Sequence, residues 1–127
     1  MHDQPAAIKD ESAAHPIAAS WRPILCKVVA AFVQGDYRLS RPITGVSPVG
    51  PELATQIENY IAEYGETLVE LPEETWETSC AQWMGSHWDV LVDLYTEGEG
   101  PSDLVLTGKV EETDGIVQLH VGLVYVP

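Results

Sequence analysis

The pattern of hydrophobic and polar residues divides the chain into a helical part and a sheet part. Within residues 20–34 the apolar side chains recur at helical spacing, and few strongly polar positions interrupt them. Ser20 is placed to cap this segment, Pro23 falls in its first turn and Gly35 follows its end. The pattern therefore predicts a helix over 20–34 that is buried on more than one side.

A second helix is predicted to begin at Pro51 and to end before Gly65, because proline suits the first helical position and glycine the residue after a helix. Residues 36–50 contain two prolines and two glycines and are expected to form an irregular connection. The second helix has one apolar stripe, so one face is expected to pack and the other to meet solvent. The stripe consists of Leu53, Ile57, Tyr60, Ile61 and Tyr64.

From Thr67 onward the hydrophobic period changes from helical to two, which is the period of a half-buried strand. The alternation is clearest in WDVLVDLY, where Trp88, Val90, Val92 and Leu94 share one face. An acidic connection is expected at 72–78, between the first two strands of this part. The strands expected are 67–71, 80–84, 88–95 and 104–111, followed by one more at the C-terminus.

Asp114-Gly115 is the strongest turn signal in the chain and predicts a two-residue hairpin. If Thr113 pairs with Ile116, the expected apolar face holds the pairs Val110–Leu119, Gly108–Val121, Leu106–Leu123 and Leu104–Tyr125. The opposite face then holds the pairs Glu111–Gln118, Lys109–His120, Thr107–Gly122 and Val105–Val124. A slip by one residue would mix the two faces, so this register is expected to be well specified.

An apolar sheet face needs a cover, and the two helices can provide it. The expected fold class is therefore α+β, with two N-terminal helices packed on one face of a four- to five-stranded antiparallel meander sheet. Residues 17–127 are expected to form this single domain. Residues 1–16, which are rich in alanine and charge, are expected to be a disordered tail.

The charge of the chain restricts its partners. Twenty acidic residues face six basic ones among 127, which gives a net charge of −14, and residues 42–127 contain Lys109 as their one basic residue. Such a field repels phosphate backbones and anionic lipid, so neither nucleic acid nor a membrane is an expected partner. It suits a basic partner protein or a divalent cation, although solubility alone also explains it. The chain has no recognisable signal peptide or long apolar run, so a cytoplasmic location is expected.

Candidate site residues come mainly from the polar face of the predicted sheet. Asp89, Asp93, Lys109 and His120 would project from it, and a carboxylate could hold the histidine for acid–base work. A solvated sheet face explains the same residues without chemistry. Trp76 is the other binding candidate, because a large ring among glutamates suits either a lid over the core or an anchor for a basic partner.

No motif in the sequence predicts a catalytic residue, a metal site or a cofactor. The acidic residues around TEGEGPSD do not match a calcium loop, and neither nucleophile motifs nor phosphate-binding glycine loops occur. The two cysteines, Cys26 and Cys80, have no metal or redox spacing and are expected to be buried thiols.

Several stretches of the sequence together resemble one family. They are WETSCAQWMGSHWDVLVDLYTEGEGPSDLVL at 76–106, the terminal VGLVYVP at 121–127, and WRPILCKVVAAFVQGDYRL and IENYIAEYG further upstream. This pattern resembles an uncharacterised family of small bacterial proteins, a domain of unknown function, and it implies no activity. In addition, VVAAFVQGDYRL before a long sheet is similar to the opening of nuclear-transport-factor-like cone domains, which makes a cone an alternative fold.

These observations favour a non-enzymatic protein-binding module for a basic partner. Toxin-neutralising immunity proteins, which are small, acidic and cytosolic, fit this outline. The alternative is a small-ligand-binding domain or an enzyme, with a pocket between the sheet and the helices. A structural subunit of a larger assembly is a third hypothesis.

Overall fold

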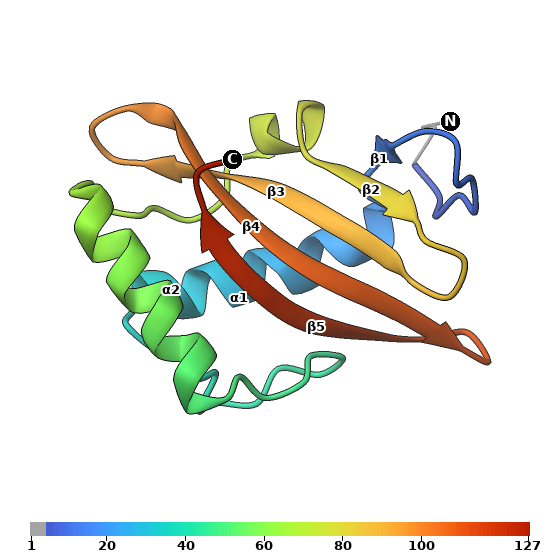
Figure 1. The fold of residues 1–127 in the computed structure, drawn as a ribbon, viewed down its shortest axis with the longest axis horizontal. Coiled ribbons are helices and arrows are strands. Elements are labelled where there is room, and N and C mark those ends of the chain that lie inside the picture. Colours follow the sequence, from blue (N-terminus) through green and yellow to red (C-terminus); the bar gives the residue numbers. More distant parts are fainter. Residues whose placement is uncertain (1–4) are drawn as a thin grey trace.

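The computed structural model describes residues 5–127 of the chain. Its centre is a five-stranded antiparallel sheet in which neighbours in sequence are neighbours in space, in the order β1-β2-β3-β4-β5 (Figure 1). The strands are β1 (His15–Pro16), β2 (Cys80–Trp83), β3 (Trp88–Thr96), β4 (Gly100–Thr113) and β5 (Ile116–Tyr125). The helices are α1 (Arg22–Val33) and α2 (Pro51–Tyr64), with short 3-10 segments η1 (Ala19–Trp21) and η2 (Glu73–Glu77). The predicted α+β fold class is confirmed.

Helix α1 begins and ends close to its predicted bounds. Pro23 lies in its first turn, as expected, but the helix has no side-chain cap at its start. At its end the N–H of Gly35 donates to the carbonyl of Phe32, and the N–H of Asp36 donates to the carbonyl of Ala31. These two bonds form a Schellman motif, which the positive φ of Gly35 (84°) makes possible.

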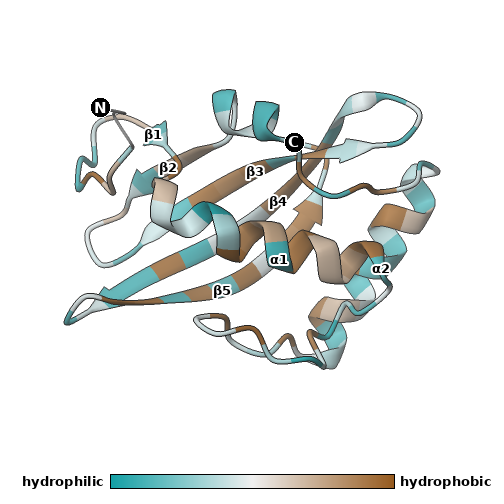
Figure 2. Cartoon of the chain, turned by 180° about the vertical axis from the view of Figure 1, so that it is seen from behind, coloured by the Kyte–Doolittle hydropathy of each residue, from teal (hydrophilic) through white to brown (hydrophobic). Residues whose placement is uncertain are grey.

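The helices cover one face of the sheet and leave the other face bare (Figure 2). Helix α1 buries four apolar side chains against the sheet and α2 buries three. From the sheet, β3 contributes Trp88, Val90, Val92 and Leu94, all at most 1% exposed. The alternation predicted for WDVLVDLY is therefore confirmed, and it decides which side chains reach the bare face. None of the described helices is long and apolar enough to cross a membrane.

The predicted hairpin register is confirmed near the turn and wrong beyond it. Asp114 and Gly115 both have positive φ, and the ladder runs as predicted from Thr113–Ile116 to Gly108–Val121. The register then shifts, so that Leu106 pairs with Val124. The extra residue in β5 forms a β-bulge opposite Thr107.

This bulge corrects the predicted core. We expected Leu123 to face the helices and Val124 to face outward. In the structure Val124 is fully buried and Leu123 is 50% exposed, because one inserted residue exchanges the faces of every residue after it.

Three different segments cover the outer edge of β3. Strand β2 pairs with its first half. Next, the Thr75 hydroxyl donates to the Asp93 carbonyl at 2.6 Å, and the Asp93 N–H donates to the Ser79 hydroxyl at 3.0 Å. The strand expected at 67–71 is reduced to a single bridge between Leu68 and Thr96.

The N-terminal residues lie along the edge of the sheet next to β2. Of the predicted tail 1–16, residues 1–4 lie outside the described residues. Residues 5–16 contact the domain largely through backbone atoms, and their last two residues form β1, which pairs with Cys80 and Ala81. The hydrophobic pattern carries no sign of such contacts, because backbone groups and not apolar side chains make them.

Candidate functional site

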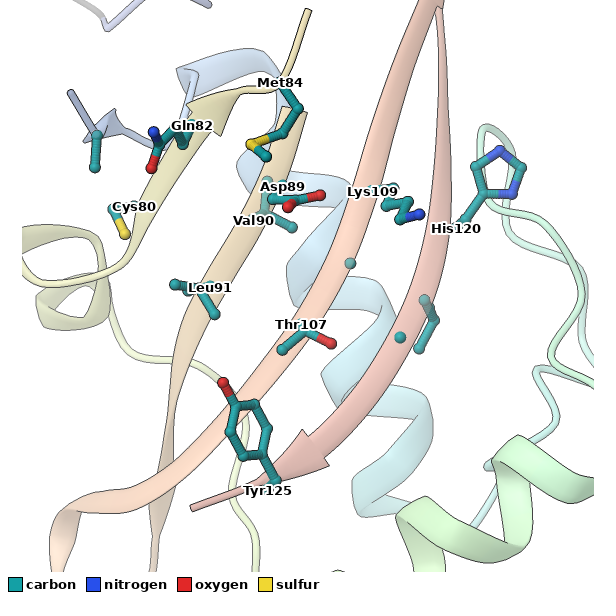
Figure 3. Close-up of a pocket in the computed structure, with 14 residues that line it drawn as sticks. Cys80, Gln82, Met84, Asp89, Val90, Leu91, Thr107, Lys109, His120 and Tyr125 are labelled. Atoms are coloured by element: carbon teal, nitrogen blue, oxygen red, sulfur yellow. The ribbon is translucent and has the colours of Figure 1, made fainter. Parts of the chain in front are cut away.

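A hollow lies on the bare face of the sheet and not between the sheet and the helices. It is half open, has a volume of about 590 Å³ and is lined by residues of β2, β3, β4 and β5 (Figure 3). The side chains of the bare face form three rows across the strands, because the antiparallel register places one residue of each strand beside the next. The first two rows line the hollow, and the third row contributes Tyr125 to it. We call this surface the bare-face hollow.

The first row is polar and contains three of the predicted site residues. Gln82 of β2 pairs with Asp89 of β3, Asp89 with Lys109 of β4, and Lys109 with His120 of β5. The structure thus confirms that these strands bring Asp89, Lys109 and His120 side by side. Figure 3 shows the His120 ring directed away from Asp89, beyond β5.

The histidine–carboxylate contacts at this row separate Asp89 from His120. His120 Nε2 lies 2.6 Å from Oε1 of Glu111, whereas Asp89 Oδ1 lies 3.1 Å from Nε2 of His87. Among residues 5–127, no carboxylate oxygen lies within salt-bridge distance of Lys109. A carboxylate thus holds His120, but it is Glu111 of β4 and not an aspartate of β3.

The second row is the apolar floor of the hollow. It runs from Cys80 through Leu91, which is 40% exposed, to Thr107 and the bulge at Gly122. Burial, followed by the charge of Asp93, raises the pKa of the Cys80 thiol. This thiol is therefore protonated at neutral pH and is a poor nucleophile.

The bulge at the end of this row requires a glycine. A Cβ on Gly122 would lie 2.5 Å from Oγ1 of Thr107 and 3.1 Å from its carbonyl oxygen. The Thr107 hydroxyl donates to the carbonyl of Leu123 at 3.1 Å, which holds the two strands together at this point.

The third row contains Asp93, Val105 and Tyr125. The backbone of Asp93 is fixed by Thr75 and Ser79, as described above, so its position on β3 is rigidly set. Tyr125 closes the hollow at the C-terminal end of β5 (Figure 3).

Trp76, the fifth predicted site residue, lies elsewhere. It is 7% exposed, it belongs to the hydrophobic core, and the guanidinium carbon of Arg22 lies 5.4 Å from its ring centroid. It acts as a lid over the core, one of the two roles expected for it, and it lies apart from the bare-face hollow.

Sequence reasoning missed the contributions of Gln82, Met84 and Tyr125 to the hollow. Tyr125 was assigned to the covered face because the bulge was not foreseen. Gln82 belongs to a strand of four residues, which is too short for its alternation to be read, and Met84 follows the end of that strand. Among residues 5–127, no three histidine, cysteine or carboxylate side chains are grouped so that they could hold a metal ion.

Comparison with known proteins gives a family but no activity. A family model described as "Domain of unknown function (DUF7668)" matches residues 29–127, which is most of the chain. Searches of the curated proteins and of the solved structures find no match. The matched region contains the last five residues of α1, all of α2 and strands β2 to β5. The chain therefore belongs to the family of the domain of unknown function DUF7668.

Proposed function

We propose that this chain is a non-enzymatic binding module for a basic protein partner, and that the partner docks on the bare-face hollow. The observation that carries the proposal is a sheet covered by helices on one face only, with an exposed leucine at the centre of the other face. Leu91 lies in the middle of the second row and is 40% exposed. An exposed apolar centre with a polar rim is typical of a protein interaction surface.

The charge of the chain favours a basic partner. Asp89 lines the hollow, and Asp93 and Glu111 lie further along the same face of the sheet, while Lys109 is the one basic residue of residues 42–127. Complementary charge accelerates association and selects among partners. The same charge disfavours a second copy of this chain, because two molecules of net charge −14 repel each other.

The groups on this face suit binding better than catalysis. The two imidazoles near it, His87 and His120, each lie against a carboxylate on the rim and outside the floor. The thiol on the floor, Cys80, has a raised pKa. A reaction needs a nucleophile or base aimed at a common point, and these residues do not provide one.

The test compares affinity purifications of the tagged protein from its own host, with quantitative mass spectrometry. Leu91→Glu places a charge on the floor of the hollow, and Ile116→Glu makes the same change at the hairpin tip, where Ile116 is 72% exposed. We expect a basic protein to be retained by the wild type and by Ile116→Glu. Leu91→Glu is expected to weaken its binding at least tenfold, measured by calorimetry with the purified partner.

Equal retention by all three proteins, or retention of acidic proteins alone, would overturn the proposal. Circular dichroism of Leu91→Glu checks that the variant is folded. The exposed position of Leu91 makes a large loss of stability unexpected.

Small size and acidic charge also support a narrower form of this proposal, in which the chain is a toxin-neutralising immunity protein and the partner is a basic toxin domain. Genomic context tests it. A toxin gene directly upstream in the genomes that encode the family supports the narrower form. The consistent absence of such a gene contradicts the immunity-protein proposal, but it leaves the broader proposal of a basic protein partner unaffected.

A second candidate function is the binding of a small ligand in the same hollow. Its volume of about 590 Å³ lies within the range of ligand pockets, and the hydroxyl of Thr107 on its floor offers a polar contact. Thermal unfolding with a small-molecule library tests this function. A rise in the unfolding midpoint of the wild type that is absent in Leu91→Glu would support it.

A further inference from the structure

Residues 5–16 form a strap that crosses from the helix-covered side of the sheet to the edge of β2. The Trp88 indole N–H donates to the carbonyl of Ile8 at 3.0 Å. The Gln82 side-chain amide donates to the carbonyl of Glu11 at 3.1 Å. At its end the strap pairs with β2 as β1. The domain thus holds the strap through backbone carbonyls and by strand addition, which is how extended peptides are bound at sheet edges.

A lysine of the strap occupies an aromatic site. The Lys9 ammonium lies 5.0 Å from the ring centroid of Trp83 and 5.9 Å from that of Trp88. The two indole rings are themselves in contact, with centroids 4.6 Å apart, and the ring of Trp21 also packs against Trp88. Two adjacent indole faces are a strong attractor for a cation.

The strap is held weakly for its length. None of its twelve residues is buried, and Ile8, its largest apolar side chain, is 44% exposed. Because little apolar surface is removed from water, opening of the strap costs much less free energy than unfolding of the core. Trp88 by contrast is 1% exposed beneath it.

We propose that the surface under the strap is a docking groove for a lysine-bearing extended segment of a basic partner protein, and that the strap occupies this groove in cis. The groove consists of Trp83, Trp88 and the edge of β2 that β1 occupies, with Gln82 at its border. It goes beyond the proposed function, because Trp83 and Trp88 pack on the helix-covered core, whereas the floor of the bare-face hollow lies on the opposite face of the sheet. It shares with the proposed function the basic charge of the partner and the bordering residue Gln82.

The distribution of charge supports this occupant. Lys9 belongs to residues 1–41, where basic and acidic residues nearly balance, whereas the strands that form the groove belong to the strongly acidic remainder. Glu112 lines the depression next to Lys9 and Trp88, so a second basic side chain beside the lysine finds a carboxylate. The groove residues also lie within the region matched by the family, and the strap lies outside it.

The test adds a peptide of residues 5–16 to the full-length ¹⁵N-labelled protein and follows the indole N–H signals by NMR. In the wild type the strap competes at an effective concentration in the millimolar range, so peptide binding is expected to be weak. Lys9→Glu removes the cation from the strap. Lys27→Glu makes the same charge change at an exposed site on α1 and serves as the matched control.

We expect the peptide to bind Lys9→Glu at least threefold more tightly than it binds the wild type or Lys27→Glu, with shifts of the Trp83 and Trp88 signals. A peptide with Lys9→Ala should bind at least threefold more weakly. A peptide with Glu11→Gln, which is more basic and keeps the contacts of Asp10, should bind at least as tightly as the original.

The proposal is overturned if no peptide binds Lys9→Glu at millimolar concentration, or if the Lys9→Ala peptide binds equally well. Shifts confined to Leu91 and its neighbours would overturn it as well. The double variant Lys9→Glu/Leu91→Glu separates this proposal from the proposed function. It should bind the peptide like Lys9→Glu even if Leu91 proves unimportant for partner capture.

Discussion

Gly122 shows how one residue decides which side chains of a strand enter the core. Because Thr107 approaches it closely, only a residue without a Cβ fits at this point of β5. The bulge that forms here exchanges the faces of the residues that follow, so Val124 is buried and Leu123 is not.

Truncation of these two neighbours tests the bulge. Val124→Ala should lower the free energy of unfolding by roughly 1.5–3 kcal/mol, because it removes two methyl groups from a fully buried position. Leu123→Ala should lower it by less than about 1 kcal/mol, although leucine is the larger side chain. Urea denaturation measures both values. The reverse order would support the unbroken register predicted from the sequence.

At the scale of the element, helix α2 seals part of the outer edge of β5. The Gln56 side-chain amide donates to the carbonyl of Val124 at 2.9 Å and accepts from its N–H at 3.4 Å. Nearer the hairpin turn, the connection before α2 does the same for Leu119. The N–H of Leu119 donates to the carbonyl of Gly45, and the carbonyl of Leu119 accepts from the N–H of Ser47. These contacts satisfy backbone groups that would otherwise invite pairing with another chain.

Loss of the Gln56 contacts should expose this edge. Gln56→Ala removes two hydrogen bonds and should cost about 1–2 kcal/mol of stability, with faster hydrogen exchange at the Val124 amide. Glu63→Ala, on the exposed face of the same helix, should cost less than about 0.5 kcal/mol. Unchanged exchange at Val124 in Gln56→Ala would show that the edge is protected in another way.

The turn within the strap should respond to acid. Hydrogen bonds from Ser12, and then from His15, lower the pKa of Asp10 from its ordinary 3.8 to about 2. A depressed carboxyl pKa means that the ionised form stabilises the turn above pH 3.8 and that this contribution is lost as pH falls through about 2. An NMR titration of the Asp10 carboxyl should give this value, and Asp10→Asn should make the Ser12 amide signal independent of pH in that range. A midpoint near 3.8 would contradict the contacts.

At the scale of the whole molecule, the excess of acidic residues should make stability depend on salt. Between about 10 mM and 0.2 M NaCl the screening length falls from about 30 Å to below about 8 Å, which weakens repulsion among the carboxylates. We expect the midpoint of thermal unfolding at pH 7 to rise by roughly 3–5 °C.

A variant with less excess charge provides the control for this salt effect. Glu58→Lys, on the exposed face of α2, reduces the net charge by two and should show a smaller rise. A midpoint that falls with salt in the wild type would indicate that attractive pairs dominate over repulsion.

The fold was largely predictable because its signals are local. Helical spacing, the glycines after each helix, the alternation in β3 and the turn at Asp114-Gly115 each act within a few residues. The bulge, the bridge at Leu68 and the path of the strap were not predictable, because contacts between distant segments produce them.

The candidate site was predictable only in part. Alternation placed Asp89, Lys109 and His120 on one face, and register brought them into one row. The sequence pattern could not show that His120 pairs with Glu111, or that Trp76 turns into the core. The direction of a side chain depends on the residues packed around it in the folded protein.

The sequence by itself determined the fold class, the faces of β3, the hairpin turn and the acidic charge, since each follows from local periodicity or composition. The tertiary structure alone decided which residues after Gly122 are buried, where the exposed apolar centre lies and what covers Trp88. Those features depend on the close approach of groups that are far apart in the chain, and the hydrophobic pattern does not predict such contacts.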